Sequence, residues 1–158
     1  MTRVVVVPGV LALLPAYAAL ADPVADLRAA CLAAVARLGA DVTVLGDAQG
    51  ERVAAYLLEA TDRSGSEPSF LVVGNGSARR TEKAPGHLDE RAHGFDADLR
   101  AWLTGDGPLP DADLGRDLLA AMTGFQLMAE QVPARGPATV DYDDDPFGVQ
   151  YWVMGWGR

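Results

Sequence analysis

The chain has 158 residues, of which 49% are hydrophobic and 22% are charged, and its net charge is −9. This length suits one domain, and the composition is ordinary for a globular protein. Nucleic acids and anionic membrane surfaces are both bound through basic residues, which an acidic chain supplies poorly. We therefore expect a single domain over residues 1–158 that binds neither nucleic acid nor membrane.

The N-terminal segment resembles a secretory signal in composition, but prolines interrupt it. Arg3 precedes an apolar run that Pro8 and Pro15 divide into pieces too short for a good signal helix. The run reads better as a buried strand at residues 4–7, and no stretch reaches the ~18 unbroken apolar residues of a membrane span. A single cysteine, Cys31, excludes an internal disulfide and fits a reducing compartment. We expect a cytoplasmic protein.

Strand-like and helix-like segments alternate along the chain. Strands are predicted at residues 4–7, 42–45, 70–73, 138–142 and 150–154, and helices at 22–39, 51–60, 89–103 and 111–132. Asp22 and Gly39 are the expected start and stop signals of the first helix, and Gly124 is expected to interrupt the last one. The order predicts a single layered α/β domain with a mostly parallel central sheet, helices on both faces and an antiparallel C-terminal edge.

A basic, glycine-rich segment follows the third predicted strand and reads G-N-G-S-A-R-R-T-E-K-A-P-G over residues 74–86. It contains three of the thirteen basic residues, Arg79, Arg80 and Lys83. Gly74 and Gly76 begin like a dinucleotide fingerprint, but the sixth position is arginine instead of glycine, so the nucleotide-binding signal is weak.

Two interpretations of this basic cluster remain open. In the first, backbone N–H groups of Gly74 and Gly76 point into a cleft, where an arginine or Lys83 helps to bind a carboxylate or phosphate. In the second, the arginines form internal ion pairs with Glu82, Asp89 or the acidic run at residues 143–145. The chain has 22 acidic residues, which favours the second interpretation.

Residues 70–96, F-L-V-V-G-N-G-S-A-R-R-T-E-K-A-P-G-H-L-D-E-R-A-H-G-F-D, resemble the LigB-like superfamily of class III extradiol ring-cleavage dioxygenases and Memo-like proteins. More narrowly, they are similar to a group of actinobacterial proteins whose glycine turn also reads G-x-G-S-A-R-R. Active members carry S-G-D-L-S-H-R-L-T, then an acidic-Ala-Pro stretch, then a helix that opens with F-D. In this sequence the three parts correspond to residues 73–81, 82–85 and 95–96.

Both ends of the chain are also similar to this family. Y-D-D-D-P-F-G-V-Q-Y at residues 142–151 resembles the closing motif Y-x-x-P-[FY]-G-V-x-Y, and residues 4–15 fit the first strand and its proline-rich loop. The resemblance implies that the family's catalytic-loop positions fall on Asn75, Ser77, Ala78 and Arg79.

The departures from the family pattern concern the metal ligands. Extradiol enzymes hold Fe(II) on two histidines and a carboxylate. One family histidine follows the first strand, where residues 8–10 are Pro-Gly-Val, and another ligand comes from the region that is 46–49 here. The histidine of the S-H-R motif falls on Ala78. The resemblance therefore implies a pseudoenzyme that needs no cofactor and acts as a binding or assembly domain.

The alternative is an extradiol dioxygenase that cleaves a catechol-type substrate with Fe(II) at a relocated site. Its candidate ligands are Asp47, Glu51, His87, His93 and Asp143.

Aromatic residues gather near the C-terminus, at Tyr151, Trp152 and Trp156. This strand is expected either to bury its rings against the sheet or to form a homo-oligomer interface. For the ligand we expect a small anionic or aromatic metabolite.

Overall fold

The computed structural model describes residues 2–17 and 21–157. Its elements are β1 (Arg3–Val7), the 3-10 helices η1 (Leu11–Leu13) and η2 (Pro15–Tyr17), α1 (Ala25–Val35), β2 (Val42–Leu45), α2 (Ala48–Glu59), β3 (Ser69–Val73), α3 (Ala92–Leu103), α4 (Ala112–Asp117), α5 (Thr123–Gln131), β4 (Thr139–Asp144) and β5 (Tyr151–Trp156). None of the helices in the described residues is long and apolar enough to cross a membrane.

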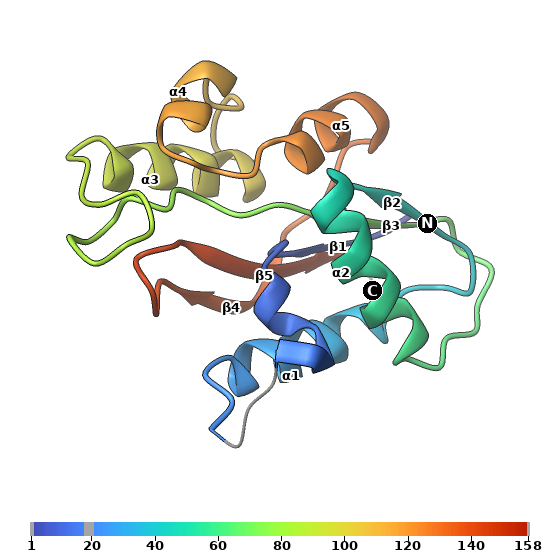
Figure 1. The fold of residues 1–158 in the computed structure, drawn as a ribbon. Coiled ribbons are helices and arrows are strands. Elements are labelled where there is room, and N and C mark those ends of the chain that lie inside the picture. The colour runs from blue at the N-terminus through green and yellow to red at the C-terminus, as the bar shows by residue number, and fades with distance from the viewer. Residues whose placement is uncertain (1, 18–20, 158) are drawn as a thin grey trace.

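The five strands form one mixed sheet in the order β2-β3-β1-β5-β4 (Figure 1). β2, β3 and β1 are parallel, and β5 and β4 are antiparallel to their neighbours. The predicted α/β class is therefore confirmed. β1 lies in the middle of the sheet, and its residues Val4–Val7 are buried, as expected for a strand that is covered on both faces.

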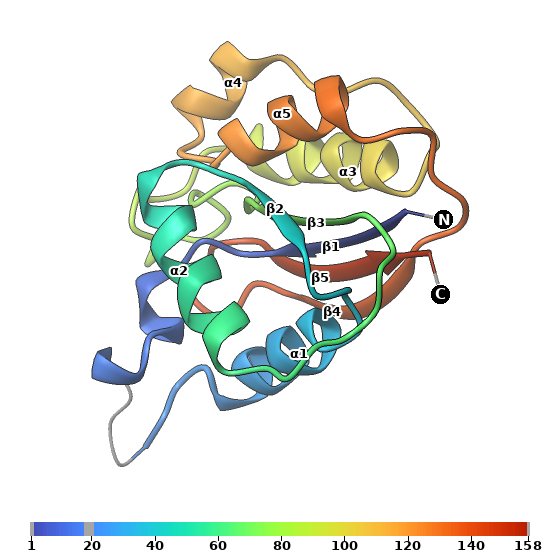
Figure 2. The same cartoon turned by 90° about the vertical axis from the view of Figure 1, so that its right-hand side faces the viewer.

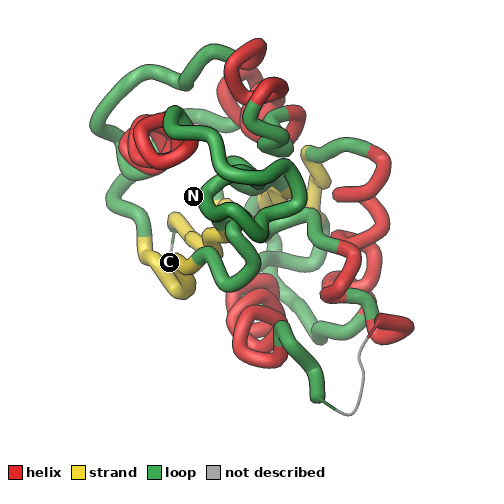
Figure 3. The backbone as a smooth tube through the Cα atoms, turned by 60° about the vertical axis from the view of Figure 1, so that its left-hand side comes forward, coloured by secondary structure: helices red, strands yellow, loops and turns green. Residues whose placement is uncertain are grey.

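Alternation along β1 divides the interior into two cores. Val5 and Val7 pack with α1 and α2, whereas Val4 and Val6 face the side that carries α3, α4 and α5. Figure 2 shows the two groups of helices on opposite sides of the sheet, and Figure 3 shows the strands enclosed between helices.

The aromatic strand β5 lies inside the sheet, paired with β1 on one side and β4 on the other. All six of its residues are buried, with Tyr151 in one core and Trp152 and Trp156 in the other. Of the two interpretations left open by the sequence, burial against the sheet is the one observed. Because β5 is paired with β1 and with β4, it has no free edge to which a second copy could add a strand. A homo-oligomer stays a prediction.

The helix predicted at residues 111–132 is interrupted, as expected, but the break lies at 118–122 and not at Gly124, so the segment forms two helices. Leu119 in this connection has a positive φ of 58°. Ala121 forms a β-bridge with Asn75 and donates its N–H to the Asn75 carbonyl oxygen. This tertiary pairing draws the chain out of the helix before Gly124, which belongs to α5.

The expected ends of the first helix are also displaced. The N-cap is Val24 and not Asp22, and the helix ends at Val35, ahead of Gly39. The Asp22 carboxylate accepts the N–H of Val24 and pairs with Arg28, so it stabilises the start of the helix from outside.

Burial of Cys31 on α1 leads to a pH-dependent prediction. Desolvation raises the pKa of this thiol to about 12, although the charge of Arg28 acts in the opposite direction. An unfolded cysteine ionises near pH ~8.5, well below the folded pKa. The contribution of the buried Cys31 thiol to the free energy of unfolding is therefore complete below pH ~8.5 and is lost as the pH rises toward 12. At pH 8 we expect Ellman's reagent to modify Cys31 only as fast as the protein unfolds, and a rapid stoichiometric reaction of the native protein would contradict this burial.

Candidate functional site

The basic loop at residues 74–91 leads from β3 to α3 and is fixed by backbone hydrogen bonds to two other connections. The N–H of Gly76 donates to the Gln150 carbonyl oxygen, and the N–H of Gln150 donates to that of Ser77. Two further bonds run from Ala78 to Leu118 and from Arg80 to Gly148. The loop is therefore attached both to the β4–β5 turn and to the α4–α5 connection.

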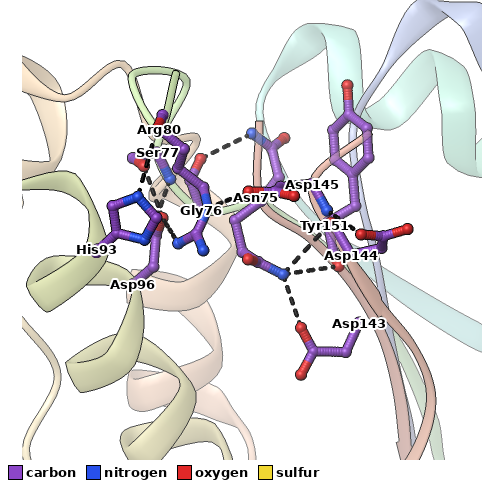
Figure 4. A network of polar contacts seen from close by, with 11 residues as sticks. Asn75, Gly76, Ser77, Arg80, His93, Asp96, Asp143, Asp144, Asp145 and Tyr151 are labelled. Carbon is purple, nitrogen blue, oxygen red and sulfur yellow. Dashed lines mark hydrogen bonds and ion pairs between the residues drawn. The ribbon is translucent and has the colours of Figure 1, made fainter. Parts of the chain in front are cut away.

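Asp96, in the first part of α3, is the centre of the polar contacts around this loop (Figure 4). Its side chain is 2% exposed. One carboxylate oxygen, Oδ1, accepts the Ser77 N–H at 2.7 Å. The other, Oδ2, accepts the Ser77 hydroxyl at 2.6 Å and Nη1 of Arg80 at 2.9 Å. The sequence identified Asp96 only as part of the F-D helix opening, and that dipeptide was the one available signal of its role.

Arg80 connects Asp96 to the β4–β5 turn, since its Nε donates to Oδ2 of Asp145 at 2.7 Å. Burial disfavours its charged form, but hydrogen bonds to Asp145 and Asp96 outweigh this and raise the pKa of Arg80. Internal pairing, the second of the two interpretations, is thus observed for Arg80. Asp145 belongs to the acidic run expected from the sequence, whereas Asp96 was not predicted as a partner.

The glycines of the loop serve close packing, and the first interpretation, in which their N–H groups point into a cleft, is not the one observed. The Gly74 N–H donates to the Val7 carbonyl oxygen, and the Gly76 N–H is bonded to Gln150. A Cβ at Gly76 would lie 2.6 Å from Oδ1 of Asp96, so only glycine allows the carboxylate to approach the loop. Figure 4 shows Gly76 and Ser77 facing Asp96 and Arg80.

The rest of the basic cluster does not converge on one point. Arg79 packs along Gly86, and its Nε is buried without a hydrogen-bond partner in the described residues. Arg91, and to a smaller extent Arg79, lowers the pKa of Asp89 to about 2. Lys83 is exposed, and no described carboxylate lies within 4.0 Å of it. Arg80 therefore points inward while Lys83 faces solvent.

The carboxyl edge of the parallel strands, where α/β folds commonly bind ligands, is closely packed here. α5 begins against it, and a Cβ at Gly124 would lie 2.2 Å from the Val73 carbonyl oxygen and 2.8 Å from that of Leu45. Phe125, the next residue, is fully buried. The start of α5 thus rests directly on the ends of β2 and β3.

Two of the three candidate carboxylate ligands, Asp47 and Asp143, are engaged in other contacts. Asp47 caps α2 by accepting the Gly50 N–H at 2.7 Å, and Glu51 lies exposed in the first turn of the same helix. Asp143 on β4 accepts from Arg100 and from Gln150.

The two histidines lie next to backbone carbonyl groups of the basic loop. Nδ1 of His87 is 3.3 Å from the Glu82 oxygen, and Nε2 of His93 is 3.3 Å from the Arg80 oxygen. In residues 2–17 and 21–157, no three His, Cys, Asp or Glu side chains gather as a metal site. The position that resemblance assigns to a ligating histidine holds Ala78, which is buried in the core. These residues do not fit an Fe(II) centre of two histidines and a carboxylate.

Ser77 is not placed as a nucleophile. Its side chain is fully buried, and its hydroxyl donates to a carboxylate that also pairs with Arg80. A catalytic serine needs access to substrate and a base poised to take its proton. The arrangement is that of a structural lock, which we name the Asp96 lock and define as Ser77, Arg80, Asp96 and Asp145.

Three cavities, of about 580, 400 and 500 Å³, open at the opposite, amino edge of the parallel strands. Two lie around Val4 and Trp156, and the third lies beside the starts of β2 and β3. None of the three is lined by residues 74–86. A comparison with protein-family models, curated proteins and solved structures finds no significant match to this chain.

Proposed function

We propose that this chain is a degenerate, single-domain member of the LigB-like superfamily that acts in the cytoplasm as a non-catalytic binding or assembly domain. The observation that carries the proposal is the buried contact of Asp96 with Ser77 and Arg80. By resemblance, this loop corresponds to the family's catalytic loop, and its Ser77 and Arg80 side chains are both engaged in internal contacts, so neither is free to bind a substrate.

The packing around the parallel strand ends supports the same proposal. Ring cleavage requires open positions on the iron for the catechol oxygens and O₂. Here the backbone of α5 meets the ends of β2 and β3 at Gly124, and Ala78 contributes to the core in place of an imidazole. A ligand of such a domain is a small anionic or aromatic metabolite, bound without chemical change.

Oxygen uptake tests this proposal. The purified protein is reconstituted with Fe(II) under anaerobic conditions and mixed with a panel of catechols in air-saturated buffer. We expect no uptake above that of protein-free Fe(II), with an active class III extradiol dioxygenase as the positive control. Uptake that disappears in a His87→Gln/His93→Gln variant would instead support the relocated iron site and retire the non-catalytic proposal.

A further inference from the structure

One arginine is held between two tryptophan rings at the amino edge of the sheet. Arg135 lies on the connection between α5 and β4. Its guanidinium carbon is 5.2 Å from the ring centroid of Trp102 on α3 and 5.2 Å from that of Trp156 on β5. Contacts of this kind attract a cation to the ring faces and fix the plane of the guanidinium group.

This cation has no acidic partner in the part of the chain that the structure describes. No described carboxylate lies within 4.0 Å of it, its Nε is buried without a hydrogen-bond partner, and Nη2 reaches only the Trp102 carbonyl oxygen at 3.5 Å. Burial lowers the pKa of Arg135. By contrast, the nearby Arg3 and Arg37 pair with Glu67 and Asp141. The two rings attract the guanidinium, but it has no anionic partner among the described residues, so a bound anion would stabilise this partly buried charge.

Arg135 lines a cavity of about 580 Å³, which is within the size range of small-molecule sites. Much of the remaining wall is apolar, formed by Val4, Val132, Pro133, Ala134, Pro137, Ala138 and Trp156. A second cavity of about 400 Å³ shares Val4, Pro137, Thr139, Trp156 and Gly157 with the first and is lined in addition by residues of the α1 side, among them Val5 and Leu38. The prolines limit backbone freedom of this wall, which reduces the entropy lost on binding.

We propose that this cavity binds a small monocarboxylate with an apolar body, its carboxylate paired with Arg135 and its body lying along the proline-containing wall. The planar guanidinium matches a carboxylate through two parallel hydrogen bonds. A single cation balances a single negative charge, whereas a phosphate dianion would leave one charge uncompensated in a protein whose net charge is already −9. This inference goes beyond the proposed function, because the carboxylate site lies at the opposite edge of the sheet from the Asp96 lock. An experiment can therefore refute the carboxylate site without refuting the proposed function, and the reverse.

Titration of ¹⁵N-labelled protein with phenylacetate and with hexanoate, at constant ionic strength, tests the site through the three tryptophan indole signals. We expect saturable shifts at Trp156, which lines the cavity, and at Trp102, whose ring contacts Arg135, and little change at Trp152, which does neither. Arg135→Met, which keeps the apolar stem, should weaken binding at least about tenfold, because the charge-assisted bonds are lost. Arg116→Gln, at an exposed ion pair on α4, is the matched control and should bind as the wild type does.

Two further ligands keep the test decisive even if Arg135→Met is poorly folded. The neutral 2-phenylethanol should bind wild-type protein far more weakly than phenylacetate, and inorganic phosphate should not displace phenylacetate. The proposal is overturned if neither carboxylate gives saturable shifts, if the alcohol binds as well as the acid, or if phosphate binds more tightly than both.

Discussion

Replacement of Asp96 by alanine is expected to lower the free energy of unfolding by about 3–5 kcal/mol. The carboxylate is buried and accepts three hydrogen bonds, two from Ser77 and one from Arg80. Without it, a buried hydroxyl and a buried backbone N–H lose their partner, and Arg80 retains only Asp145. Urea denaturation followed by circular dichroism measures the change, provided that the free energy of unfolding depends on urea concentration with the same slope in the wild type and the variant.

Two variants show whether the effect comes from the Asp96 lock. Asp98→Ala removes an exposed carboxylate from the same helix and should change the stability by no more than about 0.5 kcal/mol. Asp96→Asn keeps the shape of the side chain but removes its charge. We expect its free energy of unfolding to fall by less than that of Asp96→Ala and by more than that of Asp98→Ala. A loss below about 1 kcal/mol for Asp96→Ala would show that the lock contributes little to the fold.

Gly124→Ala is expected to destabilise the protein by roughly 1–3 kcal/mol or more. The added methyl group would lie 2.2 Å from the Val73 carbonyl oxygen and 2.8 Å from that of Leu45. Both neighbours are backbone atoms of the sheet, so α5 would have to move away from the strand ends. The shift of the urea midpoint measures the loss.

The matched control is the same substitution at another helical glycine. A Cβ at Gly94 on α3 has nothing within 4 Å, so Gly94→Ala should stabilise the protein by roughly 0.5–1 kcal/mol through helix propensity. The two alanine substitutions are thus expected to have opposite signs. Unchanged stability of Gly124→Ala would mean that the start of α5 does not rest on the sheet.

The parts of the fold that depend on local pattern were predictable. The apolar runs that form β2 and β3 end directly at a glycine, and the run that forms β1 ends at Pro8-Gly9. The structure places these strands within one residue of the prediction. The class of fold followed from their alternation with helices. Gly39 and Asp22 are good boundary residues by type, but the helix between them is shorter, Ala25–Val35, and Asp22 pairs with Arg28 from outside the helix.

The candidate site was harder to predict from the sequence, because its contacts join residues that are distant in sequence. Ser77 and Asp96 are 19 residues apart, and Arg80 and Asp145 are 65 apart. No periodic pattern indicates such partners, and the acidic residues around Arg80 were too numerous to choose among. Arg135 was missed for the same reason, since only the fold brings it between Trp102 and Trp156.

Anaerobic titration of Fe(II) into the protein, followed by calorimetry, most directly tests whether the loop after β3 is a structural lock with no metal site. We predict no binding tighter than ~100 µM, and the same heats for the His87→Gln/His93→Gln variant. Stoichiometric binding with a Kd near ~1 µM or below, lost in that variant, would contradict this prediction and would indicate that the chain keeps a functional iron site.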